Sequence, residues 1–275
     1  MSRTISKIIV STINTLMLPL SRRQGRRTIA RVINGLGQDS LSEIHTKNGD
    51  IKLFTLKSPY VASTVVRFHT DEPETIAFID EIKEGEILWD IGANIGIYSL
   101  YAALKPNINI LAFEPSGFNF GLLVEHIALN QQGSKIQPFC VALGEHTELS
   151  ALNMSNIEQG HSGNSLGEAR SQFGEYESCF TQAILAYSID SFIEQFRLPC
   201  PDHIKLDVDG IEPKILSGAK RTLSSVKTIL IEVEGENEEN AETLIEVPLS
   251  NAGFREDVSA RNSGSGKNRL YRKCQ

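Results

Sequence analysis

From residue 86 onward, short apolar runs alternate with longer segments in which apolar residues recur at helical spacing. The pattern predicts strands at Glu86–Ile91, Ile108–Phe113 and Ile136–Val141, with helices at Asn94–Leu104 and Phe118–Leu129 between them. Pro138 in the third run either weakens the prediction of a strand or marks an edge strand, because proline cannot donate a ladder hydrogen bond. Strand–helix–strand repeats of this kind predict a parallel, doubly wound α/β sheet.

The same alternation returns in the last third of the chain. It predicts strands at Ile184–Tyr187, His203–Gly210 and Val226–Val233, the second of which runs into a turn. Helices are expected at Asp190–Phe196, Glu212–Leu223 and Asn237–Val247, the last of which Pro248 stops. Two final strands, near Phe254–Val258 and Asn268–Arg272, flank a Ser/Gly/Asn turn at 262–267. We therefore predict an α/β fold built on a mostly parallel seven-stranded sheet with helices on both faces.

Between these halves, a strand is expected at Leu149–Leu152, and the pattern then breaks. Residues 153–180 are rich in Ser, Gly, Asn and Glu and show no apolar periodicity. A loop this long inside a compact domain is usually functional or disordered. Two interpretations stay open here: a lid or substrate loop that orders on binding, or plain surface disorder.

A small β element is expected ahead of the main sheet. A turn at residues 47–50 separates Ile44 from the alternating run Ile51–Leu56, and Ser63–His69 has the composition of a further strand. Glu72 and Pro73 then open a helix over Glu74–Ile82, with acidic residues in its first turn as the helix dipole favours.

The N-terminus has a different character, because every charged residue from Arg3 to Arg31 is Lys or Arg. Between these cations, Ile8–Leu20 is moderately apolar but too short to span a bilayer. The pattern favours an amphipathic helix docked on or flanking the core, and a peripheral membrane or partner-binding helix is the alternative. We expect two parts: a basic helical segment at residues 1–42, and a domain at 43–275 that contains the small β element and the insertion at 153–180.

Composition narrows the functional classes. The chain has 275 residues, 40% of them apolar, which suits one large α/β domain with an appendage. A net charge of −7 argues against a general nucleic-acid-binding protein, since phosphate binding needs a basic surface. The four cysteines are scattered without metal-ligand spacing, so we expect no zinc site and a reduced, cytoplasmic protein.

The turn after the first main strand points to a nucleotide-like cofactor. A dinucleotide fingerprint needs glycine at the first, third and sixth positions, but counting from Gly92 the chain has Asn94 and Ile97 at the last two. The pattern present is Asp-x-Gly-x-Asn-x-Gly from Asp90 to Gly96, followed by Glu114 at the end of the next strand. This fits S-adenosylmethionine: the glycines admit its methionine and ribose portion, Asp90 receives polar groups, and Glu114 accepts hydrogen bonds from both ribose hydroxyls.

Several segments together resemble one family. They are Trp89–Gly96, Phe113-Glu114-Pro115 with Asn119, Val141–Gly144, Ile189–Phe192, and Lys205-Leu206-Asp207-Val208-Asp209-Gly210 with Glu212. In these segments the chain resembles the FkbM family of S-adenosylmethionine-dependent methyltransferases, although family members more often carry Glu at the position of Asp209. The resemblance implies a Rossmann-like class I methyltransferase fold, with Pro115 and Ala142 in the cofactor site, and O-methylation of a hydroxyl on a sugar, glycan or other small molecule.

The acceptor side is expected after the fourth parallel strand, where ligands bind in such sheets. Asp207 and Asp209 are candidates to take the hydroxyl proton, and the alternative for Asp209 is a turn or capping role. Lys205 inside a buried strand needs a carboxylate partner, for which we expect Glu232, in a structural or a catalytic pair. His161 in the irregular loop is a further candidate base.

Two other functional classes remain open at this point. An NAD-linked or nucleotide-sugar-linked enzyme could use a similar sheet, and a catalytically silent member could bind a partner through its basic N-terminus. Asp207, Asp209 and Glu232 could also hold Mg²⁺, although we do not count a metal among the expected cofactors.

Overall fold

The computed structural model describes residues 11–13, 15, 22–38 and 41–274. By its contacts the chain divides into two compact units, Met1–Leu41 and Ser42–Gln275. In the first unit, helix α2 spans Arg22–Gln38, whereas most of the apolar run Ile8–Leu20 lies outside the described residues. Among the described helices, none has the length and apolar character needed to cross a membrane. The contact of this segment with a membrane surface or a partner stays a prediction.

The second unit is built on a seven-stranded sheet with the order β14-β15-β13-β12-β3-β4-β5. The strands are β3 (Ile87–Ile91), β4 (Asn109–Phe113), β5 (Ile136–Phe139), β12 (His203–Leu206), β13 (Thr228–Glu232), β14 (Phe254–Glu256) and β15 (Asn268–Lys273). The five strands from β13 to the edge strand β5 are parallel, and at the other edge β15 pairs antiparallel with both β13 and β14. The predicted mostly parallel sheet is confirmed, and Pro138 does lie in the edge strand β5.

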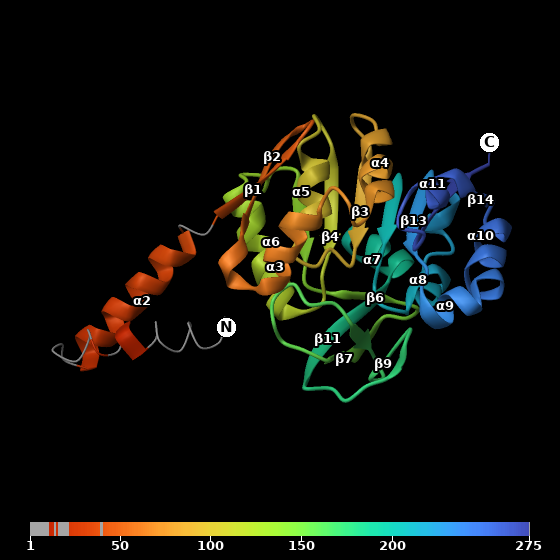
Figure 1. Cartoon of the computed structure of the whole chain (residues 1–275). Coiled ribbons are helices and arrows are strands. Elements are labelled where there is room, and N and C mark those ends of the chain that lie inside the picture. Colours follow the sequence, from red (N-terminus) through yellow and green to blue (C-terminus); the bar gives the residue numbers. More distant parts are fainter. Residues whose placement is uncertain (1–10, 14, 16–21, 39–40, 275) are drawn as a thin grey trace. The chain divides into compact units, whose positions relative to one another are not determined.

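Helices cover both faces of this sheet (Figure 1). They are α3 (Pro59–Arg67), α4 (Pro73–Glu81), α5 (Ile97–Ala103), α6 (Gly117–Leu129), α7 (Ile189–Phe196), α8 (Glu212–Ser217), α9 (Gly235–Glu239), α10 (Val247–Asn251) and α11 (Val258–Ser263), with short helical turns at Thr55–Lys57, Thr222–Ser224 and Glu242–Glu246. Neighbouring residues of β3 separate into two cores: Leu88 packs with the cluster that contains α4, α5 and α6, and Trp89 packs with the cluster that contains α7 and α8. Such alternation is what a sheet buried on both faces requires.

A second, four-stranded sheet has the order β6-β11-β7-β8 and lies at the bottom of Figure 1. Its strands are β6 (Ala142–Gly144), β7 (Glu148–Met154), β8 (Asn164–Leu166) and β11 (Phe180–Ser188). The short hairpin of β9 (Arg170–Ser171) and β10 (Gly174–Glu175) follows β8. The segment 153–180 thus contains strands that its irregular composition does not indicate. A further hairpin joins β1 (Leu41–Thr46) and β2 (Gly49–Phe54).

The strand predicted at Ser63–His69 is wrong, because these residues largely belong to helix α3. Ser58 caps this helix by accepting a hydrogen bond from the backbone N–H of Tyr60, and Pro59 occupies its first turn. The helix buries Val61 in the core. A cap and a buried face therefore outweigh the β-branched residues that suggested a strand.

Two further predictions near the C-terminus need correction. Pro248 does not stop a helix, because it lies in the first turn of α10, directly after a π-helical turn at Glu242–Glu246. Proline is tolerated in a first turn since its missing N–H has no partner there. Part of the segment expected as a turn at 262–267 belongs to helix α11, which starts at Val258.

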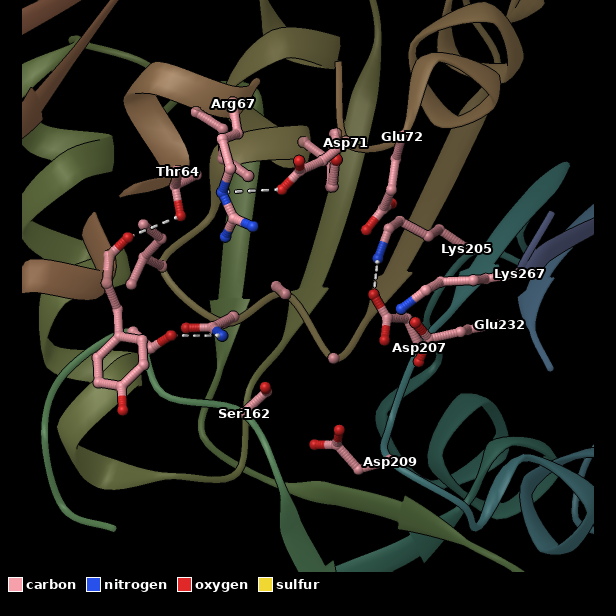
Figure 2. Close-up of a pocket in the computed structure, with 18 of the residues that line it drawn as sticks. Thr64, Arg67, Asp71, Glu72, Ser162, Lys205, Asp207, Asp209, Glu232 and Lys267 are labelled. Carbon is pink, nitrogen blue, oxygen red and sulfur yellow. Dashed lines mark hydrogen bonds and ion pairs between the residues drawn. The ribbon is translucent and has the colours of Figure 1, made fainter. Parts of the chain in front are cut away.

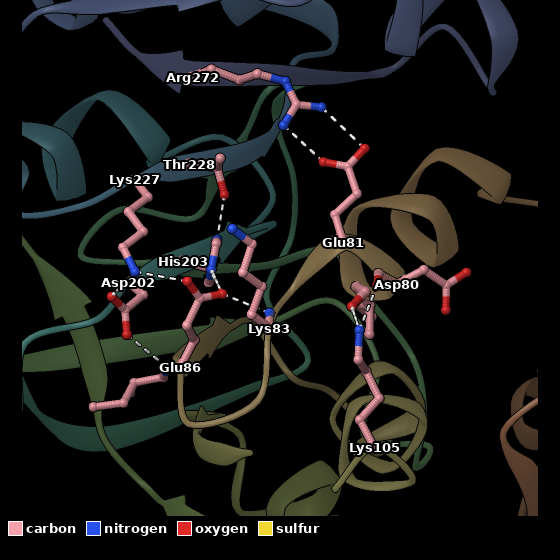
Figure 3. A network of polar contacts seen from close by, with 12 residues as sticks. Asp80, Glu81, Lys83, Glu86, Lys105, Asp202, His203, Lys227, Thr228 and Arg272 are labelled. Carbon is pink, nitrogen blue, oxygen red and sulfur yellow. Dashed lines mark hydrogen bonds and ion pairs between the residues drawn. The ribbon is translucent and has the colours of Figure 1, made fainter. Parts of the chain in front are cut away.

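The amino ends of the parallel strands are closed by a polar network (Figure 3). His203, the first residue of β12, contacts Glu86 through Nε2 at 2.8 Å and Thr228 through Nδ1 at 2.6 Å. Glu86 also pairs with Lys227 at 2.7 Å. The Lys227 ammonium and the protein hydrogen bonds around Glu86 hold the pKa of that carboxyl at about 2, against the effect of burial. Ion pairs and hydrogen bonds therefore link the strands at this end of the sheet. Ligands in sheets of this kind bind at the opposite edge, where the parallel strands have their carboxyl ends.

Candidate active site

The turn after β3 lies directly against the strand end of β12. Gly92 has a φ of +83°, which favours glycine, and its N–H donates to the Phe113 carbonyl of β4 at 3.0 Å. A Cβ atom at Gly92 would stand 1.7 Å from the carbonyl oxygen of Asp207. Only glycine allows these two backbones to touch, so the glycine turn and the segment carrying Asp207 are in direct contact.

Glu114 follows β4 and is buried. Its carboxylate accepts two backbone hydrogen bonds at 2.8 Å, one from Asn94 and one from Ser116. Burial raises the pKa of this carboxyl to about 7, although those two N–H groups favour its charged form. Glu114 thus ties the turn after β3 to the turn after β4 and adds charge as pH rises through neutrality.

These turns enclose a cavity of about 110 Å³, here named the glycine-loop cavity. Its lining includes Gly92, Asn94, Glu114, Pro115, His161 and Asp209. Three buried polar atoms of lining residues have no hydrogen-bond partner among the described residues: Asn94 Oδ1, His161 Nδ1 and Asn164 Oδ1. Buried polar groups are nearly always paired, so this cavity is suited to a ligand with several polar groups.

A second cavity of about 30 Å³, here named the apolar cavity, adjoins the first through Gly92 and Pro115. Its other lining residues include Phe113, Ala142, Leu143 and Ile211. The predicted cofactor residues Gly92, Pro115 and Ala142 therefore meet here. Its apolar residues can pack against the edge of a ring that belongs to a ligand in the first cavity.

A third cavity of about 350 Å³, here named the carboxylate pocket, opens between β12, β13 and the start of α4 (Figure 2). Lys205 is buried and lies between the carboxylates of Glu72 and Asp207, with its ammonium 2.8 Å from Asp207 Oδ2. Burial opposes the charge of Lys205, but Asp207, Asp90 and Glu72 raise its pKa above the usual value. The prediction that Glu232 is the direct partner of Lys205 is wrong, because Lys205 forms its ion pair with Asp207, two residues later in the sequence.

Glu232, at the end of β13, takes a different part in this cluster. The negative charge of Asp207 and burial raise the pKa of Glu232 to about 10, and the two side chains are hydrogen-bonded. Burial acts against ionisation of Asp207, but the Lys205 ammonium lowers the pKa of that carboxyl. Near neutral pH the pair therefore consists of a protonated Glu232 and an ionised Asp207.

Asp209 stands where the glycine-loop cavity and the carboxylate pocket meet, since it lines both. Its φ of +61° is unusual for an aspartate. The side chain accepts a hydrogen bond from the Gly163 N–H at 2.7 Å. Burial and the nearby charge of Asp207 raise its pKa to about 6. Asp209 is thus an ionised carboxylate above pH 6, close to both cavities.

His161 lies over the glycine-loop cavity, and the lining of the carboxylate pocket does not include it. Burial lowers the pKa of its imidazole, and its ring packs edge-on against Tyr60 at 5.0 Å. Asn119 holds this loop: its amide donates to the His161 carbonyl at 3.0 Å and accepts from the Gly160 N–H at 2.8 Å. His161 therefore closes the first cavity rather than facing the second.

Asp90 and Gly96 support the turn from behind, and neither lines the three cavities described. Asp90 is buried and accepts a hydrogen bond from Ser99 Oγ at 2.6 Å. A Cβ atom at Gly96 would stand 2.3 Å from Leu123 of α6. The structure thus brings together all the other predicted site residues, and these two shape the turn that carries them.

Reasoning from the sequence missed several residues of the carboxylate pocket, among them Glu72, Gln172 and Phe173. Glu72 directly precedes helix α4, where an acidic residue is expected for the helix alone. Its sequence context therefore gives no indication that it lies beside Lys205. Gln172 and Phe173 come from the hairpin of β9 and β10, in a segment without apolar periodicity. Only the length of that irregular segment indicated a functional role.

Comparison of the sequence with known families matches residues 90–256 to the methyltransferase FkbM domain. The hexuronic acid methyltransferase AglP of Haloferax volcanii is 26% identical over 155 residues, which cover 56% of this chain and 59% of AglP. The 31-O-demethyl-FK506 methyltransferase FkbM of Streptomyces tacrolimicus is 30% identical over 63 residues, covering 22% of this chain and 24% of that protein. The match to each of these curated relatives thus spans less than two thirds of the relative's length.

Among solved structures, the precorrin-6y C5,15-methyltransferase of Geobacter metallireducens aligns with a TM-score of 0.41 at 14% identity, covering 66% of this chain and 70% of the other. The family match covers more than half of the chain and includes the glycine turn, Glu114 and the carboxylates after β12. The chain therefore belongs to the FkbM family of methyltransferases.

Proposed function

We propose that this protein is an S-adenosylmethionine-dependent O-methyltransferase that acts on a hydroxyl of a sugar, glycan or other small molecule. One observation carries the proposal: the glycine-loop cavity and the carboxylate pocket share five lining residues, namely Gly92, Asn94, Ser162, Asp207 and Asp209. A ligand in the first cavity and a ligand in the second would therefore meet at these residues. Holding two reactants in such contact is the main requirement for direct group transfer.

The residues of the first cavity fit S-adenosylmethionine. Three unpartnered polar atoms and the Glu114 carboxylate can receive the amino-acid and ribose groups, and the apolar residues around the small second cavity can pack against the edge of the adenine ring. When bound, S-adenosylmethionine supplies an electrophilic methyl group. The glycine turn holds the Asp207 backbone against the first cavity, because Gly92 carries no side chain to separate the two segments.

We propose that Asp209 is the base that takes the proton from the hydroxyl group of the acceptor. A hydroxyl must lose its proton as the methyl group arrives, and a carboxylate with a pKa of about 6 is both ionised at pH 7 and basic enough to help. Asp207 is less suited to this role because it forms an ion pair with Lys205, and Glu232 is less suited because it is already protonated beside Asp207. Because these oxygens already have partners, we do not propose a Mg²⁺ ion among Asp207, Asp209 and Glu232.

The names of the relatives agree with an oxygen acceptor. AglP is named for a hexuronic acid, which is a sugar derivative, and FkbM for the 31-O position of its substrate.

The general test is methyl transfer from methyl-labelled S-adenosylmethionine into glycan and small-molecule extracts. Binding of NADH without binding of S-adenosylhomocysteine, measured by calorimetry, would instead support the NAD-linked alternative.

Replacing Glu114 by glutamine is expected to weaken S-adenosylhomocysteine binding by about 10- to 100-fold, the equivalent of one or two charge-assisted hydrogen bonds. In the wild type, affinity should rise as pH increases through about 7, where Glu114 becomes ionised. The Glu114→Gln protein should lose this rise. Isothermal titration calorimetry from pH 6 to pH 8 measures both effects. Glu148→Gln is the control, because Glu148 is exposed on β7; equal affinity of all three proteins would refute the cofactor role of Glu114.

Replacing Asp209 by asparagine is expected to lower kcat by about 10²- to 10⁴-fold, the usual contribution of a positioned base. The wild-type rate should increase with pH through about 6 and then level off, because Asp209 accepts a proton only when ionised. The variant should show no such step. Initial rates of labelled methyl transfer across pH 5 to 8 test this, with the exposed Asp50→Asn as control. A retained pH step in Asp209→Asn would assign the proton to another group.

A further inference from the structure

The cations of the carboxylate pocket are already engaged by carboxylates of the same pocket. Lys205 pairs with Asp207 at 2.8 Å and Lys267 with Glu234 at 2.6 Å. Arg67 pairs with Asp71 at 3.3 Å. All six of these residues line the pocket.

Three further carboxyl groups line the pocket: Glu72, Asp209 and Glu232. None of them has a cation within 4 Å in the part of the chain that the structure describes. A negatively charged ligand would therefore meet carboxyl groups and no free cation. Asp209 is ionised near neutral pH, and its charge repels an anionic ligand strongly in a partly enclosed site, because little water screens it. Carboxyl groups without a cation are instead good partners for hydroxyl groups, which both donate and accept.

The hairpin of β9 and β10 adds two features of the kind that bind a hydroxylated ring. Phe173 lines the pocket and is 74% exposed, so its ring is open to contact with a ligand. Gln172, its neighbour, is only 6% exposed, and its buried Oε1 has no hydrogen-bond partner among the residues with described positions. An apolar wall beside an unsatisfied acceptor suits a ligand with one apolar face and hydroxyl groups at its edge.

We propose that the carboxylate pocket binds the methyl acceptor as a sugar ring without a negative charge, packed against Phe173 and hydrogen-bonded to Gln172 and to the carboxyl groups. This inference rests on the proposed methyltransferase function and makes it more specific. It separates this protein from AglP, whose name gives a hexuronic acid as its substrate. A hexuronic acid differs from the corresponding neutral sugar by one carboxylate, so the difference can be tested with a matched pair of ligands.

The test compares methyl β-D-glucopyranoside with methyl β-D-glucuronide on the full chain saturated with S-adenosylhomocysteine. Saturation-transfer NMR titrations measure binding of each ring without any need for turnover. We expect the glucoside to bind at least about 10-fold more tightly than the glucuronide. Equal or tighter binding of the glucuronide overturns the inference, and so does binding of neither ring. Failure of S-adenosylhomocysteine to bind, measured first by calorimetry, would instead refute the proposed function.

Variants of the pocket rim make the test sharper. Glu234→Gln should release Lys267 and raise the relative affinity for the glucuronide several-fold, whereas Lys267→Met should not.

Phe173→Ala should weaken glucoside binding about 10-fold. Leu149→Ala is its matched control, because Leu149 is 75% exposed on β7 and lines none of the three cavities. None of the four substitutions should change S-adenosylhomocysteine affinity. An unchanged ligand preference in Glu234→Gln, or unchanged glucoside binding in Phe173→Ala, would contradict the charge or the stacking argument respectively.

Discussion

Replacing Gly92 by alanine is expected to abolish S-adenosylhomocysteine binding and to destabilise the fold by several kcal/mol. The new Cβ atom would stand 1.7 Å from the Asp207 carbonyl oxygen and 2.8 Å from its carbonyl carbon. Both positions are backbone, so no side-chain rotation can relieve the overlap. The turn after β3 or the segment after β12 must move, and both line the glycine-loop cavity. Calorimetry with S-adenosylhomocysteine and urea unfolding measure the two effects.

Gly85→Ala is the matched control for this variant. Gly85 has the same φ of +83°, but a Cβ atom there meets nothing within 4 Å. Its substitution should cost only the strain of a left-handed alanine, about 1–2 kcal/mol. The difference between the two variants isolates the contact with Asp207. If Gly92→Ala behaves like Gly85→Ala in both assays, the close approach of the two turns plays no part in the site.

Replacing Lys205 by methionine is expected to lower the free energy of unfolding by about 3–5 kcal/mol at pH 7 and to remove detectable methyl transfer. Lys205 is only 3% exposed, and its ammonium is the charge that balances Asp207, with Asp90 and Glu72 nearby. Methionine preserves most of the length of the side chain but leaves these carboxylates uncompensated. Urea unfolding measures the loss of stability, and labelled methyl transfer measures the loss of activity.

The pH dependence of that loss has a definite sign. In the wild type the pKa of Asp207 is lowered by Lys205, so the stability it contributes is present above the unfolded value of 3.8 and is lost as pH falls through the folded value. Without Lys205 the carboxylates take up protons more readily, and the difference between variant and wild type should shrink toward acid pH. The double variant Lys205→Met with Asp207→Asn should recover part of the stability. A pH-independent deficit would argue against an electrostatic cause.

The central part of the site could be predicted because it is encoded locally. Gly92 and Asn94 follow directly on a short apolar strand, and Glu114 ends the next one. In a parallel sheet the carboxyl ends of neighbouring strands must meet at one edge, so the convergence of these residues follows from chain order. Asp207 and Asp209 are predictable for the same reason.

The remainder depends on contacts between distant segments. The partner of Lys205 could not be chosen from the sequence, since Asp207 and Glu232 both lie near the end of their strands and only side-chain geometry decides between them. Helix α3 was missed because Val65 and Val66 favour a strand locally, whereas the cap at Ser58 favours a helix. Phe173 has no local signal at all, because its exposure in the carboxylate pocket depends on where the second sheet places its hairpin.

The contact between Gly92 and Asp207 has a consequence for how the specificity of this protein can change. Because the two backbones touch, a mutation that reshapes the acceptor side through β12 also displaces the donor side. Within the hairpin of β9 and β10, the backbone of Gln172 shares this kind of contact, because it packs against Gly210 and Gly235. Phe173 is different, since its side chain is 74% exposed and lines neither the glycine-loop cavity nor the apolar cavity. New acceptor preferences can therefore be engineered or selected at Phe173 while methyl-donor affinity is retained, which makes this position the natural target for a substitution library.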